Sequence, residues 1–109
     1  MITMHIGLCE GRHEIKQNNG EALDGFIFSQ VDSPMDFLSH FHTAKDYFSD
    51  NHAHTWEDGV HLYITGLTTL LTATLLAAEK QGIEKLILMH YDRESGKYVP
   101  QDVSPLLES

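Results

Sequence analysis

Residues 60–91 constrain the fold of this chain most, because their pattern changes from that of a strand to that of a helix and back. The apolar residues of segment 60–64 alternate with polar or aromatic ones, as in a strand with one buried face. Thr65-Gly66 then interrupts the strand, and leucines and alanines recur at helical spacing as far as Gly82, a residue type that commonly ends helices. Residues 86–89 are continuously apolar, which is typical of a strand covered on both faces. The stretch therefore predicts a βαβ unit.

The rest of the chain extends this unit at both ends. Residues 1–9 alternate and predict a first strand, whereas residues 26–28 allow only a short extended piece. Ser33-Pro34 predicts the start of a helix that runs to about residue 50. Residues 97–100 predict a returning edge strand, because proline is tolerated there. The predicted fold class is α/β, a mostly parallel sheet in the order β-α-β-α-β-β with a C-terminal antiparallel edge strand.

Two further expectations concern the first helix and the tail. The buried stripe of the helix is predicted to consist of Phe37, Leu38, Phe41, Ala44 and Phe48. Residues 101–109 are predicted to be irregular.

Length and charge limit the possible partners. The 109 residues suit a single domain over residues 1–109, and the net charge of −9 disfavours long nucleic acids and anionic membranes. The single cysteine, Cys9, cannot form an intramolecular disulfide, and no apolar run approaches the roughly 20 residues of a membrane span. We expect a soluble cytoplasmic protein that does not bind membranes.

Polar residues follow each of the strands predicted to be parallel. Because the carboxyl ends of parallel strands share one edge of the sheet, segments 10–14, 65–69 and 90–93 should meet there. Both arginines of the chain fall in these segments, which suggests bidentate recognition of a phosphate or carboxylate. A helix that begins near Gly66 would add backbone N–H donors. The predicted ligand-binding residues are Arg12, Thr65, Gly66, Leu67, Thr68, Thr69, Asp92 and Arg93.

A structural interpretation of the same residues stays open. The arginines could pair with surface carboxylates, and Gly66 could serve only as a turn residue. Thr72 and Thr74 are better explained by packing against the sheet or a second subunit.

His13 is the candidate for acid–base catalysis, since histidine titrates near neutral pH and charged neighbours could tune it. The alternative is a solvated loop histidine. Cys9 is interpreted as a small buried apolar residue rather than a nucleophile. Histidines 40, 42, 52 and 54 match no zinc-binding pattern, so we expect neither a metal nor a cofactor.

Residues 62–99 resemble the nucleotide-binding half of small Rossmann-like proteins. The similarity lies in the Thr65-Gly66 turn, the apolar helix and strand, and Tyr91-Asp-Arg-x-x-Gly-x-Tyr-Val99. It points to CRISPR-associated Rossmann-fold sensors and small ring nucleases, including viral antagonists of cyclic-oligonucleotide signalling. The resemblance implies a homodimer that holds a cyclic oligonucleotide across its two-fold axis, with Thr65-Gly66 on phosphate and Arg12 and Arg93 gripping or cleaving it. We expect no effector domain within residues 1–109, and these residues show no clear nuclease motif.

Three functions follow from these observations. The first is binding, by sequestration or processing, of a small nucleotide-derived anion, possibly a cyclic oligonucleotide, at the carboxyl edge of the sheet. The second is a metal-independent phosphodiesterase or ring nuclease that uses His13. The third is an acidic adaptor that docks on a partner protein through the apolar helix of residues 67–82.

Overall fold

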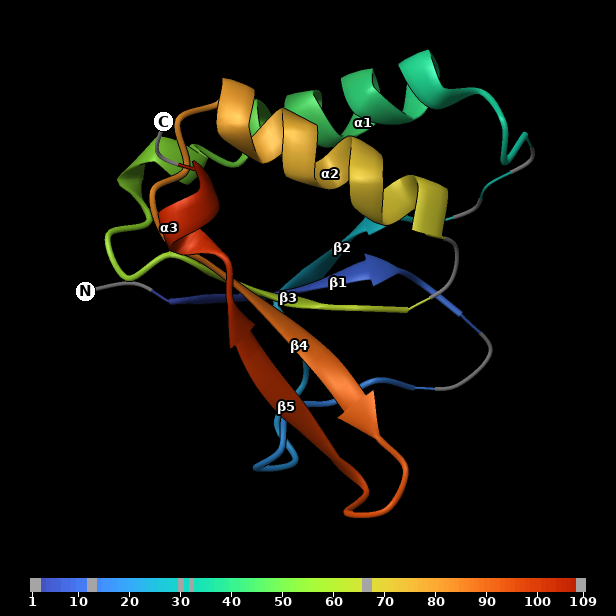
Figure 1. Ribbon diagram of the computed structural model, residues 1–109, viewed down its shortest axis with the longest axis vertical. Coiled ribbons are helices and arrows are strands. Elements are labelled where there is room, and N and C mark those ends of the chain that lie inside the picture. Colours follow the sequence, from blue (N-terminus) through green and yellow to red (C-terminus); the bar gives the residue numbers. More distant parts are fainter. Residues whose placement is uncertain (1–2, 12–13, 30, 32, 66–67, 108–109) are drawn as a thin grey trace.

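The computed structural model describes residues 3–11, 14–29, 31, 33–65 and 68–107. These residues form an α/β fold around one sheet (Figure 1). The strands are β1 (Met4–Cys9), β2 (Gly25–Phe28), β3 (Val60–Tyr63), β4 (Leu86–Asp92) and β5 (Lys97–Asp102). The helices are α1 (Phe37–Asp50), α2 (Thr68–Lys80) and the short α3 (Ser104–Leu107), and a 3₁₀ turn, η1 (Ala53–Thr55), follows α1. The prediction of an α/β fold is confirmed.

The sheet has the strand order β2-β1-β3-β4-β5. Strands β2, β1, β3 and β4 are parallel, with Ile6 opposite Leu62 and Leu62 opposite Leu88. Strand β5 returns antiparallel to β4. The mostly parallel sheet with an antiparallel strand at its C-terminal edge is thus confirmed, and the short extended piece at residues 26–28 belongs to a full parallel edge strand, β2.

Helices α1 and α2 pack side by side on the same face of the sheet (Figure 1). The reason is the handedness of parallel connections, which are almost always right-handed. The β2–β3 and β3–β4 connections move across the sheet in one direction, so their helices lie on one face. The β1–β2 connection moves in the opposite direction, and the segment around residues 14–24 passes beneath the sheet (Figure 1). The face without α1 and α2 is called the helix-free face below.

The apolar core fills the space between the sheet and the helices. Residues of even number on β1, β3 and β4 point into it, and Leu70, Ala77, Ala44 and Phe48 meet them from the helices. This arrangement follows the period of two that the strands show in the sequence. The fully buried members from the sheet are Ile6, Leu8, Val60, Leu62 and Leu86.

Helix α1 differs from its predicted stripe. Ala44 and Phe48 are buried as expected, together with His40, but Phe37 and Leu38 are 54% and 68% exposed. The helix begins at Phe37, where Asp36 is the N-cap residue and its side chain accepts the Ser39 N–H at 3.3 Å. Phe37 and Leu38 therefore lie in the first turn and face outward beside α2.

The tail is also more ordered than predicted. Strand β5 reaches Asp102, and Ser104 then hydrogen-bonds the Leu86 backbone through its hydroxyl, which accepts the Leu86 N–H at 2.9 Å. The sequence prediction of an irregular tail was wrong up to Leu107, because these contacts form only after β5 has paired with β4.

None of the helices in the described ranges combines the length and the apolar character needed to traverse a lipid bilayer.

Gly59, the residue before β3, lies against the Lys85 backbone, and its substitution measures how closely the two segments pack. Its φ is +83°, and a Cβ atom there would lie 2.4 Å from the Lys85 carbonyl oxygen. Gly82 has a comparable φ of +73° but open space around it. We predict that Gly82→Ala lowers the free energy of unfolding by about 1–2 kcal/mol, the cost of the left-handed backbone alone. Gly59→Ala should lose roughly 1–3 kcal/mol more because the methyl group collides with backbone. Urea unfolding of both variants measures the difference, and equal losses would contradict the close approach.

Candidate functional site

A pocket of about 790 Å³ lies at the carboxyl ends of β1 and β3. Four segments line it: residues 9–11 after β1, residues 14–18 of the β1–β2 connection, residues 64–65 after β3, and the β4–β5 hairpin at Tyr91 and residues 95–98. The volume falls within the roughly 300–1,000 Å³ typical of small-molecule sites. Segments far apart in the chain thus converge on one concave site.

The strand order explains why the pocket forms at this edge. The chain leaves β1 toward β2 and leaves β3 toward β4, so the connections of two neighbouring strands depart in opposite directions. A crevice opens where they separate, and open α/β sheets bind ligands at such a point. The pocket occupies this place and is extended by the projecting β4–β5 hairpin (Figure 1).

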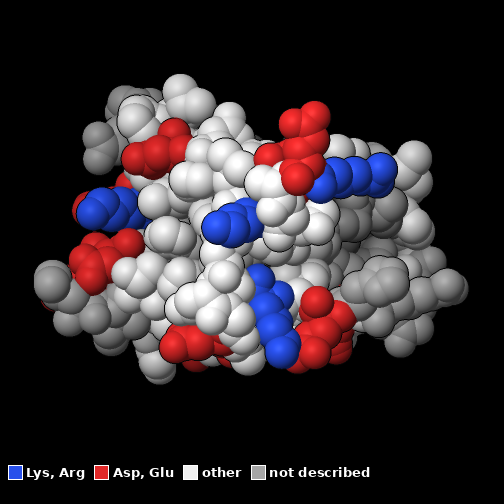
Figure 2. All heavy atoms as spheres, turned by 90° about the horizontal axis from the view of Figure 1, so that it is seen from below, with Lys and Arg blue, Asp and Glu red and all other residues white. Residues whose placement is uncertain are grey.

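Among the described residues that line the pocket, acidic and basic side chains are equal in number. They are Glu10 and Glu14, and Lys16 and Lys97. Lys16 Nζ lies 3.9 Å from Glu14 Oε1, but these side chains are 50% and 75% exposed, so the ion pair is weak. Seen from below the sheet, basic and acidic side chains are interspersed among uncharged ones (Figure 2). Such a surface suits a ligand of low charge better than a long polyanion.

Two tyrosines form the aromatic wall of the pocket. The rings of Tyr91 and Tyr98 meet edge to face, with centroids 5.4 Å apart. Tyr98 also packs against Tyr63, a nearly buried residue of β3, with centroids 4.9 Å apart. Burial and the neighbouring Tyr91 raise the pKa of Tyr98, so its hydroxyl is neutral at physiological pH. The wall offers apolar ring area together with hydroxyl groups.

Of the predicted ligand-binding residues, Thr65 lines this pocket. Its hydroxyl donates to the Cys9 carbonyl at 2.8 Å and accepts the Cys9 N–H at 3.3 Å, which joins the ends of β1 and β3. Thr68 is exposed at the start of α2, and the Thr69 hydroxyl donates to the Pro34 carbonyl at 3.3 Å. The threonine hydroxyls of residues 65 and 69 are therefore engaged with backbone.

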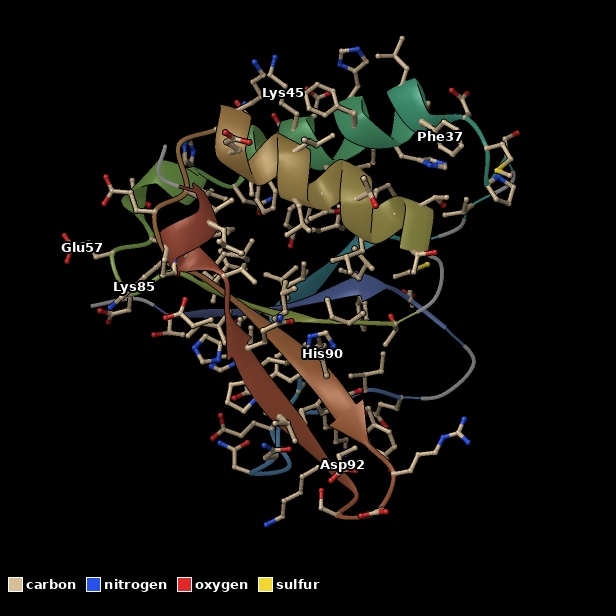
Figure 3. The ribbon with its side chains drawn as sticks, in the orientation of Figure 1. Phe37, Lys45, Glu57, Lys85, His90 and Asp92 are labelled. Atoms are coloured by element: carbon tan, nitrogen blue, oxygen red, sulfur yellow. The ribbon has the colours of Figure 1, made fainter. Side chains whose placement is uncertain are left out.

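Asp92 and Arg93 belong to the turn between β4 and β5. Hydrogen bonds from Ser95 and from the Glu94 N–H lower the pKa of Asp92, whose carboxylate shapes the turn at the far end of the hairpin (Figure 3). Arg93 is exposed and is not one of the pocket-lining residues, although Ser95, Gly96 and Lys97 of the same hairpin are. Arg12, His13, Gly66 and Leu67 lie outside the described residues, so their assigned roles stay predictions.

Cys9 lines the pocket beside Glu10. Burial and the Glu10 carboxylate raise the pKa of its thiol, which disfavours the thiolate needed for nucleophilic attack. Within the described part of the chain, no group of three or more His, Cys, Asp or Glu side chains could hold a metal ion.

The sequence interpretation did not assign Lys16, Lys97 or Tyr98 to the site. Tyr98 lies in the motif quoted for the family resemblance, but no sequence signal showed that β5 would bring it next to the segment after β1. Lys16 and Lys97 belong to no motif that would distinguish them from the other lysines of the chain.

A polar cluster on the helix-free face was also missed. His5 lies directly opposite His61 across β1 and β3, with ring centroids 4.9 Å apart, and His5 Nδ1 is hydrogen-bonded to the Tyr63 hydroxyl at 3.0 Å. The alternation of these strands places all three residues on this face, so the signal was present in the sequence. The Tyr98 ring connects this cluster with the pocket.

Comparison of the chain with protein-family models, curated proteins and solved structures gave no significant match.

His61 should make stability depend on pH. Burial, and then the neighbouring His5, lower its pKa below the usual 6.5, so the folded state binds this proton less readily than the unfolded state. Well above pH 6.5 the histidine is neutral in both states, so it does not reduce the free energy of unfolding. As the pH drops from 6.5 through the lowered folded-state pKa, the unfolded state binds the proton first and the free energy of unfolding should fall. We predict that His61→Gln loses less stability than the wild type between pH 7.5 and pH 5. Urea unfolding of both proteins at both pH values checks this. An equal loss of stability in His61→Gln and the wild type would argue against the lowered pKa.

Proposed function

We propose that the protein is a Rossmann-like domain that binds a small anion of the nucleotide type in the pocket at the carboxyl ends of β1 and β3. The observation that carries the proposal is the coincidence of this pocket with the point where the connections after β1 and β3 diverge. Sheets of this kind commonly place small ligands there.

The pocket supports a ligand with a planar ring. Tyr91 is 55% exposed, and together with Tyr98 it offers aromatic surface beside the Ser95 hydroxyl and the Gln17 amide. Aromatic rings bind nucleobases well because every base has a flat apolar face, whereas polar side chains can select its edge.

Lys97 supports the anionic part of the ligand. Within the described residues it forms no ion pair, whereas Lys16 is within reach of Glu14. An ammonium group without a partner at a pocket wall attracts a phosphate, and Glu10 and Glu14 limit how much negative charge the pocket accepts. We therefore propose one nucleotide unit with a single phosphate group per pocket. The homodimer and the cyclic oligonucleotide implied by the family resemblance would present such units to two copies of the pocket.

Substitution of Lys97 tests the proposal. We expect at least one of AMP, GMP, CMP, UMP and cyclic di-AMP to raise the Tm of the wild type, because a ligand that binds only the folded state stabilises it. Lys97→Ala should weaken that binding about tenfold or more, the usual effect of losing a hydrogen bond to a charged group. Lys45→Ala is the matched control, since Lys45 lies on the helical layer, away from the hairpin (Figure 3). Absence of any stabilisation, or equal losses in both variants, would contradict the proposal.

Chromatography of the bound nucleotide separates binding from turnover. An intact ligand supports a binding protein, and a cleaved one would favour the phosphodiesterase alternative that depends on His13.

The charge balance predicts an order of affinities. AMP should bind more tightly than adenosine because of Lys97, and more tightly than ATP because Glu10 and Glu14 repel the added phosphates. Calorimetric titration of adenosine, AMP, ADP and ATP at 50 mM salt measures the series. A steady gain in affinity from AMP to ATP would show that the acidic residues do not limit ligand charge.

A further inference from the structure

One side chain of the β1–β2 connection is hydrogen-bonded to the far edge of the sheet. Asn18 Nδ2 donates to the Tyr98 carbonyl oxygen at 3.0 Å, and the Tyr98 backbone N–H donates to Asn18 Oδ1 at 2.9 Å. The two residues are 80 positions apart in the chain. In an antiparallel sheet, a neighbouring strand would pair with the backbone N–H and carbonyl of an edge residue in the same way. The Asn18 amide therefore takes the place of a strand residue opposite Tyr98.

The turn that carries Asn18 is shaped by its own hydrogen bonds. The Gln17 N–H donates to the Glu21 carbonyl at 2.9 Å, and the Gly20 N–H donates to the Gln17 carbonyl at 2.9 Å. Asn19 Oδ1 accepts the Glu21 N–H at 2.9 Å, and residues 16 and 22 form a β-bridge. Contact with β5 is therefore not needed to shape the turn, and Asn18 governs where the turn lies.

Both partners are anchored to the same place on the helix-free face. The connection ends at Asp24, whose N–H donates to the His5 carbonyl at 2.7 Å and whose carboxylate accepts the His5 N–H at 2.8 Å. From the other side, the Tyr98 ring packs on Tyr63, whose hydroxyl is bonded to His5 Nδ1. The contacts form a closed circuit through His5, Tyr63, Tyr98, Asn18 and Asp24, in which the exposed Asn18–Tyr98 pair is the outermost link.

This link also joins two walls of the pocket. Residues 14–18 form one wall and residues 95–98 another, and both Asn18 and Tyr98 line the pocket. The width of the space between them depends on the Asn18–Tyr98 pair.

We propose that Asn18 is the positioning residue of the pocket, which latches the turn of residues 16–22 onto β5 and so fixes the gap that the ligand enters. This inference rests on the proposed function for its effect on binding, whereas the latch itself can be observed without a ligand. If the gap is already fixed in the free protein, binding does not have to order the two walls, and the entropic cost of binding is smaller. Because such coupling is reciprocal, a ligand that touches both walls must in turn strengthen the latch.

Amide hydrogen exchange and AMP titration of Asn18 variants test the inference together. In Asn18→Ala, exchange at the Tyr98 amide should be roughly tenfold faster, as expected for loss of its acceptor. AMP affinity should fall about three- to tenfold, and saturating AMP should slow Tyr98 exchange in the wild type. Asn18→Asp keeps the acceptor oxygen but loses the donor, so it should restore protection of the Tyr98 amide.

Asn19→Ala is the control, since Asn19 is the adjacent residue of the same type and its side chain accepts the Glu21 N–H within the turn. It should leave both Tyr98 exchange and AMP affinity at the wild-type values. Unchanged Tyr98 exchange in Asn18→Ala would overturn the latch. Faster exchange with unchanged AMP affinity would overturn the positioning role and leave the proposed function intact. A wild type that binds none of AMP, GMP, CMP, UMP and cyclic di-AMP overturns the proposed function and with it the positioning role. Tyr98 exchange then tests the latch alone.

Discussion

The right-handedness of parallel strand connections is the constraint on which the rest of this structure depends. The chain moves from β1 to one side of the sheet and from β3 to the other, so this rule sends the two connections to opposite faces. Both long helices then cover one face, and the segment around residues 14–24 takes the other (Figure 1). The same reversal opens the crevice at the ends of β1 and β3, so layering and pocket have a common cause.

A sheet face without a helix needs other means of satisfying its polar groups. Here the cluster of His5, His61 and Tyr63 supplies ring packing and a partly buried hydrogen bond between His5 and Tyr63. The β1–β2 connection supplies the Asp24 carboxylate, which accepts the His5 backbone N–H. Such a cover has less apolar area than a packed helix and should open more readily than the core. The pocket has this connection as one of its walls, beside the ends of β1 and β3 and the β4–β5 hairpin.

The electrostatic character of the pocket differs from that of the whole chain. The sequence has a net charge of −9, yet the described charges around the pocket cancel. Balanced charges among the described lining residues are compatible with the proposed ligand, which carries a single phosphate group. Lys97, which forms no ion pair among the described residues, and the glutamates at positions 10 and 14 are the local charges on which the proposed preference for a single phosphate depends.

The sequence by itself determined four of the strands and the two long helices, because its periods of two and 3.6 residues and its apolar run at residues 86–89 report which side chains are buried. The parallel direction of the central strands followed from the helical connections between them. It also indicated the sheet edge where Thr65 and the segment after β1 meet. It did not determine the position of β2, the outward face of Phe37, or the members of the pocket. Tyr98 and Lys97 reach the pocket only because β5 pairs with β4, and Asn18 reaches Tyr98 only because the β1–β2 connection crosses the helix-free face. These contacts join residues up to 80 positions apart, and local periodicity carries no information about such pairs.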